Sequence, residues 1–125
     1  MFKLVAERRA HPRIPAKDHP GTIAGFTQLR VLDLSFCGAL VETDAWLIPG
    51  RHYAVRIEPG ISLGATVVRC TLHRIPNGRR DRVVRRAGLL FDEPDDVVRR
   101  QLLLLLRALG SMASDSPPVE VAIAG

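Results

Sequence analysis

Two short polar motifs near the N-terminus hold the residues best suited to binding chemistry. The first is an RxxxR motif formed by Arg9 and Arg13, with Arg8 immediately before it. The second, Asp33-Leu-Ser-Phe-Cys-Gly38, reads DxSxxG. A guanidinium fork can bind phosphate oxygens or the O6/N7 edge of guanine through two parallel hydrogen bonds. Together the motifs predict a site for an anionic, guanine-containing ligand.

The DxSxxG motif supplies three different groups where a strand is expected to end. Asp33 brings a carboxylate, Ser35 a hydroxyl, and Gly38 a backbone that a ligand can approach closely. The same residues also suit a purely structural role. Asp33 and Ser35 can cap a β-turn through side-chain-to-backbone hydrogen bonds, and Gly38 can serve that turn alone. Likewise, the arginines can form a solvated basic segment.

Composition narrows the class of protein. The 125 residues suffice for one domain with its own core, and the formal net charge is +5. Sixteen of the 18 Lys and Arg residues are arginines, which suggests a phosphate-bearing partner, or else a GC-rich codon bias. Cys37 and Cys70 lack metal-ligand spacing and are expected to be reduced thiols, and no apolar run is long enough for a signal peptide or membrane span. We therefore expect a cytoplasmic protein.

Enzymatic chemistry finds no support in the sequence. There is no glycine-rich phosphate loop, no metal-ligand cluster and no recognisable nucleophile–base pair. We therefore expect no catalytic residues, no metal site and no cofactor.

Turn and strand signals predict a mainly β domain. Residues 14–22 hold two prolines and a glycine and are expected to form a loop. Asn77-Gly78 predicts a β-hairpin, and the acidic stretch with Pro94 predicts a helix start, with Gly110 as its end. The expected strands are 22–34, 39–43, 52–58, 62–75 and 82–91, followed by a helix over 97–109. This pattern predicts a small antiparallel barrel of five or six strands capped by one C-terminal α-helix.

The predicted helix has a wide apolar surface. Val98, Leu102, Leu105 and Leu109 share one face, whereas Leu103 and Leu104 lie off that stripe. The extra width fits either a deeply docked helix or a surface for a homodimer or another partner.

With both motifs in order on a barrel-like pattern, the chain from Glu7 to Leu109 resembles the PilZ domain, the bacterial receptor module for cyclic di-GMP. The strands at 63–69 and 87–91 and the terminal helix match that family in order and spacing. The resemblance implies a PilZ-type barrel of about six strands over residues 21–110. A flexible N-terminal arm would span residues 1–20, and a disordered tail residues 111–125.

The resemblance also implies roles for the motif residues. Arg9 and Arg13 would bind guanine or phosphate from the flexible arm, and Asp33 would accept hydrogen bonds from guanine N1–H and N2–H₂. Arg8, next to the motif, would favour a stacked ligand dimer. The implied ligand set is Arg8, Arg9, Arg13, Asp33, Ser35 and Gly38. The protein would then be a cyclic di-GMP receptor or adaptor that signals to an unidentified effector protein.

A second cluster of arginines supports rival interpretations. It lies around the predicted hairpin and comprises Arg69, Arg74, Arg79, Arg80, Arg82, Arg85 and Arg86, opposed only by Asp81. A basic hairpin can bind nucleic acid, but this one lacks the stacking aromatics of single-strand binders. It can equally be a charged edge that prevents aggregation, or a ligand or partner surface. A PilZ-like interaction module without ligand is the main alternative, and a nucleic-acid-binding barrel a less favoured one.

Overall fold

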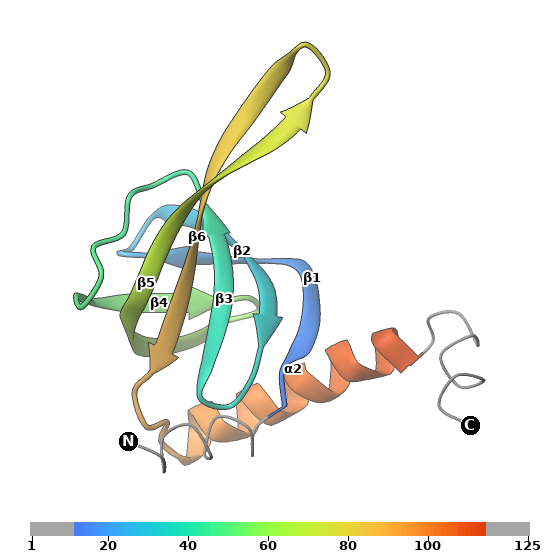
Figure 1. Ribbon diagram of the computed structural model, residues 1–125. Helices are drawn as coiled ribbons and strands as arrows, with labels where there is room; N and C mark the ends of the chain where they lie inside the picture. Colours follow the sequence, from blue (N-terminus) through green and yellow to red (C-terminus); the bar gives the residue numbers. More distant parts are fainter. Residues whose placement is uncertain (1–11, 115–125) are drawn as a thin grey trace.

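Six antiparallel strands close into a barrel in the computed structural model, which describes residues 12–114 and the side chains of residues 12–110 (Figure 1). The strands follow the ring order β1-β2-β3-β6-β5-β4, and the helix α2 follows the last strand. Their bounds are β1 Ile14–Ile23, β2 Thr27–Leu34, β3 Gly38–Thr43, β4 His52–Ile57, β5 Ile61–Asn77, β6 Arg80–Phe91 and α2 Asp96–Ser114. The predicted fold class, a mainly β six-stranded barrel with one C-terminal helix, is confirmed.

The first strand occupies residues for which a loop was predicted, so that prediction is wrong. β1 pairs with β2 from Ile14 to Ile23, and with β4 at its far end. The pairing of β1 with β2 is interrupted between Pro15 and His19 by a bulge, in which Lys17 and Asp18 adopt positive φ values of 50° and 61°. Pro15 borders this bulge, where a missing N–H is tolerated. The last residues of the predicted 1–20 arm are therefore part of the barrel.

The prediction of one strand over residues 22–34 is also wrong. Ile23 pairs with Thr27 across a three-residue turn that ends β1 and begins β2. Ala24 and Gly25 make this turn with φ values of 56° and 95°, the second of which glycine adopts without strain. The turn residues Ala24-Gly25-Phe26 contain no proline and no Asn-Gly pair, so the sequence gives only a weak signal of the break.

The β5–β6 hairpin is confirmed, although its turn lies one residue later than Asn77-Gly78 suggests. Asn77 pairs with Arg80, so Gly78 and Arg79 form the two-residue loop. Of these two, Gly78 has a positive φ, 63°, as a type II′ turn requires at its first central position. Both strands run longer than predicted and project beyond the barrel as a two-stranded extension (Figure 1).

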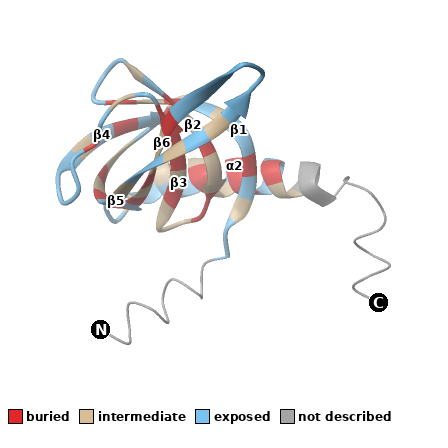
Figure 2. Ribbon diagram, turned by 45° about the horizontal axis from the view of Figure 1, so that its top comes forward, coloured by how far each residue is buried: buried red, intermediate tan, exposed pale blue. Residues whose placement is uncertain are grey.

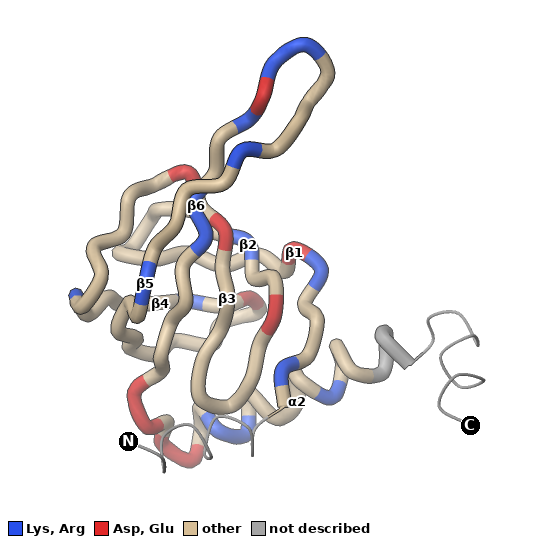
Figure 3. The backbone as a smooth tube through the Cα atoms, viewed as in Figure 1, with Lys and Arg blue, Asp and Glu red and all other residues tan. Residues whose placement is uncertain are grey.

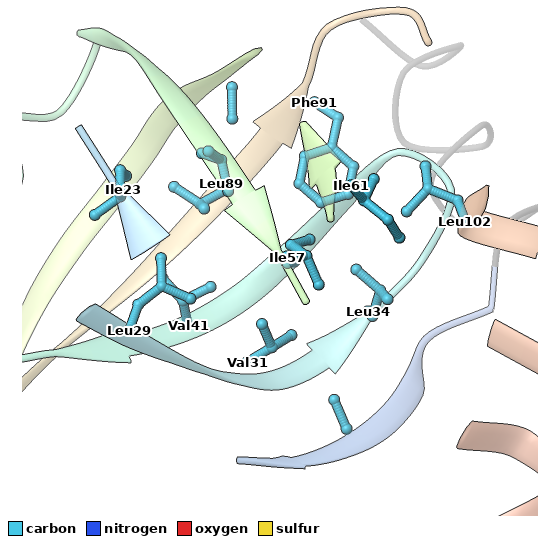
Figure 4. Packing of buried hydrophobic residues seen from close by; sticks show 14 of the residues in the cluster. Ile23, Leu29, Val31, Leu34, Val41, Ile57, Ile61, Leu89, Phe91 and Leu102 are labelled. Atoms are coloured by element: carbon cyan, nitrogen blue, oxygen red, sulfur yellow. The ribbon is translucent and has the colours of Figure 1, made fainter. Parts of the chain in front are cut away.

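The core fills the barrel and continues onto the helix (Figures 2 and 4). Leu102 is fully buried and lies beside Leu34, Ile61 and Phe91 at the end of the barrel that α2 covers. Leu105 and Leu109 are also buried, as the predicted stripe requires, whereas Leu104 is exposed.

The helix begins where predicted but does not end at Gly110. The Asp95 carboxylate accepts a hydrogen bond from the Val98 N–H at 2.8 Å, which caps the first turn. The helix then passes through Gly110 to Ser114, because nothing at Gly110 forces a left-handed turn. The predicted tail therefore starts with four helical residues, and residues 115–125 lie outside the described part of the chain.

Candidate functional site: a polar hollow on the outer face of the barrel

A bulge in β2 sets the direction of the Asp33 side chain. Val31 pairs with Val41 and Asp33 with Leu40, so β2 carries one extra residue, Leu32, between them. The bulge reverses the alternation, and both Val31 and Leu34 reach the core while Asp33 turns to the outer face.

The Asp33 carboxylate is only partly satisfied. Its Oδ2 lies 3.9 Å from Nη1 of Arg13, a long ion pair in which the Arg13 side chain is 63% exposed and that of Asp33 23%. Its Oδ1 is buried and has no hydrogen-bond partner within residues 12–110. A buried acceptor without a partner costs about 1–3 kcal/mol, which a ligand donor could recover. The pairing of Pro15 with Asp33 brings Arg13 to this position.

Ser35 is engaged in the turn between β2 and β3. Its buried hydroxyl oxygen accepts hydrogen bonds from the N–H groups of Cys37 and Gly38 at 3.3 and 3.2 Å. The Ser35 N–H donates to the Gly38 carbonyl at 2.9 Å. Ser35 therefore caps the turn, as the structural alternative predicted for it, whereas Asp33 makes no such capping bond among the described residues.

Gly38 is required by strand packing. A Cβ atom built on it would overlap the carbonyl oxygen of Leu89 on β6, where β3 and β6 begin to pair. The absence of a side chain at Gly38 thus serves the barrel itself. This role is structural, but it lies in the packing of β3 against β6 and not in the turn that the sequence suggested, and it leaves the Gly38 backbone beside the hollow described next.

The motif residues border a hollow of about 230 Å³ on the outer face of β3, β5 and β6. Its floor is Gly88, where an added Cβ would meet only Val68, at 4.0 Å. A bulge at Val68 in β5 places Arg69 opposite Gly88. The hollow is lined by Arg13, Ser35, Cys37, Gly38, Ala39, Leu40, Val68, Arg69, Gly88, Leu89 and Leu90. It combines two guanidinium groups with an apolar floor, which suits a ligand that has both anionic groups and flat rings.

A carboxylate held between two arginines forms the next row of the same face. Glu42 on β3 pairs directly with Arg30 on β2 and with Arg86 on β6. Its two oxygens accept from Nε of Arg30 at 3.2 Å and from Nε of Arg86 at 3.1 Å. The Glu42 side chain is only 10% exposed, so this ladder is a partly buried, net-positive row next to the hollow.

The structure brings four of the six predicted site residues to one place. Arg13, Ser35 and Gly38 line the hollow, and Asp33 contacts Arg13 at its edge. Arg8 and Arg9 lie outside the described residues. Sequence reasoning missed Arg69 as a site residue and assigned it to the basic hairpin, because the bulge that turns it toward Gly88 leaves no clear sequence signal.

Two negative observations apply to the described residues. Among them no group of three or more His, Cys, Asp or Glu residues could hold a metal ion. Likewise, α2, the helix of this region, is not long and apolar enough to cross a membrane.

Comparison with known proteins identifies the family. The PilZ domain model matches residues 7–108. The solved structure titled as the PilZ domain with c-di-GMP of YcgR from Escherichia coli superposes with a TM-score of 0.72 and 19% identity. That match covers 88% of this chain and 99% of the other. A second solved structure is MrkH, titled as a c-di-GMP dependence transcription regulatory factor. It gives a TM-score of 0.61 at 13% identity, over 85% of this chain and 51% of MrkH.

The comparison with curated protein sequences gave no match. The two structural likenesses, at such low identity, establish the fold, and the family model accounts for most of the chain. The barrel, its C-terminal helix and the two motifs agree with that match: this chain belongs to the PilZ domain family.

Proposed function

We propose that this protein is a cyclic di-GMP receptor, an adaptor without catalytic activity that passes its ligand-bound state to an effector protein. Membership of the PilZ family supports this proposal, and so does the solved structure of the same fold, which is the PilZ domain of YcgR with c-di-GMP. The proposal includes a bacterial, cytoplasmic location, which the free thiols of Cys37 and Cys70 support.

The observation that carries the proposal is the buried, unpartnered Oδ1 of Asp33 at the edge of the hollow, as judged from the described residues. Guanine presents two adjacent donors, N1–H and N2–H₂, that a carboxylate can accept together. A structural role for Asp33 would satisfy this oxygen within the fold, as the Ser35 oxygen is satisfied. An acceptor that is buried and left free fits binding better than folding.

The surrounding groups suit the rest of the ligand. Arg13 and Arg69 lie on the border of the hollow and can hold phosphate oxygens or a guanine edge. In the proposed mechanism, Arg8 and Arg9 close over the ligand from the N-terminal segment, with Arg8 lying against a base of a stacked dimer. Ser35 and Gly38 shape the turn on which the ligand rests. Closure requires that the ligand bind the closed form more tightly than the open one.

Asp33→Ala tests the proposal because it separates binding from folding. The variant removes a buried acceptor that has no hydrogen-bond partner among the described residues. We expect the free energy of unfolding to stay the same or to rise by up to about 1–3 kcal/mol, because the variant removes an unsatisfied buried acceptor. We expect calorimetric affinity for cyclic di-GMP to fall at least about tenfold, as for loss of a bidentate base contact. A matched control is Asp92→Ala, which removes an exposed carboxylate bonded to His52.

The opposite pattern would overturn this assignment. If Asp33→Ala unfolds more easily and the folded fraction binds as wild type does, Asp33 is structural. The Arg9→Ala/Arg13→Ala double variant gives a second reading, because it should lose binding without loss of stability.

The second candidate is an interaction module that binds no ligand. Two observations favour it: Ser35 caps the β2–β3 turn, and Gly38 permits the close pairing of β3 with β6. The fold alone therefore requires these two motif residues, whether or not a ligand binds. A partner protein or a second copy of the chain could then bind to α2, where Val97 and Leu104 are 66% and 61% exposed. Such binding is also compatible with a ligand-binding protein. A folded wild-type protein that gives no heat with cyclic di-GMP would favour this candidate.

A further inference from the structure

The β5–β6 hairpin extends well beyond the barrel as a two-stranded ribbon, here called the hairpin ribbon and defined as residues 70–86 (Figure 1). The pairing of β6 with β3 ends at Thr43 and Arg85, and that of β5 with β4 ends at His52 and Thr66. Past these points β5 and β6 pair only with each other in the described part of the chain. From residue 70 to residue 84 the ribbon thus presents two faces and two edges that no other described strand covers, whereas Arg85 and Arg86 at its base pair with β3.

The hairpin ribbon carries the whole net charge of the protein. It holds six arginines (Arg74, Arg79, Arg80, Arg82, Arg85 and Arg86) and one acidic residue, Asp81, for a net +5. The full chain has 18 Lys and Arg and 13 Asp and Glu, so the remaining residues hold 12 of each and are neutral. Figure 3 shows basic positions gathered at the tip and along the ribbon, around a single acidic one. A polyanionic or acidic partner would be drawn to this element.

One face of the hairpin ribbon also exposes apolar side chains. The cross-strand pairs Leu72–Arg85 and Arg74–Val83 place these four residues on a common face, with the two apolar ones on one diagonal. Leu72 is 59% and Val83 47% exposed. At the base of this face the Arg85 guanidinium lies 5.2 Å from the ring centroid of Trp46, which is itself 57% exposed. We call this set the ribbon face: Trp46, Leu72, Arg74, Val83 and Arg85.

We propose that the ribbon face is the docking surface for a partner protein, and that it binds a segment combining carboxylates with apolar side chains. The patch combines Trp and Arg, residue types that are enriched at the hot spots of protein interfaces, with two exposed aliphatic side chains that such a segment would cover. A charged edge that only prevents aggregation accounts for the arginines, but not for Leu72 and Val83 on an open ribbon. Duplex nucleic acid would be held by the arginines alone. For single strands the ribbon residues 70–86 add no Phe, Tyr or Trp, and the one tryptophan of the ribbon face, Trp46, already lies against Arg85.

The inference rests on the proposed function, since it supplies the surface through which the receptor would reach its effector. The two sites are physically continuous. The strands that form the hairpin ribbon also line the hollow, through Val68 and Arg69 on β5 and Gly88 on β6. The β5 bulge lies between them, at the root of the ribbon.

The test uses fluorescence anisotropy on the full chain with three defined probes. Two are extended peptides of equal length and charge, one alternating Glu with Leu and the other alternating Glu with Ser. The third is a short DNA duplex. We expect the Glu–Leu peptide to bind at least about tenfold more tightly than the Glu–Ser peptide, because only it can cover the apolar diagonal.

Two double variants separate the contribution of the apolar side chains from that of the arginines. Leu72→Ser/Val83→Thr should reduce Glu–Leu binding to the level of the Glu–Ser peptide. Arg74→Gln/Arg85→Gln should weaken both peptides, whereas Arg100→Gln/Arg107→Gln, which removes two exposed charges from α2, should weaken neither. Circular dichroism confirms that each variant is folded, and the Leu72→Ser/Val83→Thr variant should still bind cyclic di-GMP as wild type does.

Two results would overturn the inference. One is equal affinity for both peptides together with tighter, sequence-independent binding of the duplex, which would identify a nucleic-acid surface. The other is no binding of either peptide by the folded wild-type chain. Titration of the same samples with cyclic di-GMP distinguishes these failures from failure of the receptor proposal, because it reports on the hollow alone.

Discussion

Filling the hollow at its floor should weaken ligand binding without harm to the fold, and Gly88→Val is the change that does so. A Cβ at residue 88 would meet only Val68, at 4.0 Å, which is ordinary contact, and the φ of Gly88 is not in the positive region. Replacing a strand-interior glycine typically gains roughly 0.5–1 kcal/mol. We therefore expect the melting temperature to stay the same or rise.

The added side chain would instead occupy ligand space. Three carbon groups, each comparable to the ~30 Å³ share of a water molecule, take up roughly a third of the hollow, whose volume is about 230 Å³. Overpacking of this kind costs about 1–3 kcal/mol, or about a 5- to 150-fold loss of affinity. Calorimetric titration with cyclic di-GMP measures the loss. Wild-type affinity in a folded Gly88→Val protein would refute the placement of the ligand in this hollow.

Three further changes test the fold around the site by thermal or urea unfolding. Gly38→Ala should destabilise the barrel by about 1–3 kcal/mol, because its Cβ overlaps the Leu89 carbonyl; an unchanged melting temperature would show that β3 and β6 can separate there at no cost. Leu102→Ala should cost about 2–5 kcal/mol and loosen α2 from the barrel end; a smaller loss would mean that the helix is only weakly docked. Glu42→Gln should cost about 1–3 kcal/mol by leaving two guanidinium groups without their shared carboxylate, and a neutral effect would contradict a structural role for the ladder.

Much of the fold could be predicted because its signals are local. A few adjacent residues are enough to predict the hairpin near Asn77-Gly78, the β-branched strand around Val67 and the capped start of α2. β1 could not be predicted in the same way. Its prolines and glycines suggest a loop, and only pairing with β2 and β4, together with a bulge at Lys17 and Asp18, makes that segment a strand.

In the candidate site, too, local motifs could predict some residues, whereas roles that depend on strand pairing could not be predicted. The motifs marked Arg13 and Asp33, which the structure brings within 3.9 Å of each other. They could not show that Ser35 is committed to the turn, or that Gly38 is demanded by Leu89 across the β3–β6 pair. Arg69 was hidden as a site residue because a one-residue bulge reverses the side on which every later side chain of β5 lies.

The most direct test of the central claim is calorimetric titration of the wild-type protein with cyclic di-GMP beside cyclic di-AMP. The two ligands share their phosphates, but adenine lacks the N1–H and N2–H₂ donors that Oδ1 of Asp33, which has no partner among the described residues, would accept. We predict saturable binding of cyclic di-GMP and an affinity for cyclic di-AMP that is at least about tenfold lower. No saturable binding of cyclic di-GMP by the folded protein, or equal affinity for both ligands, would contradict it.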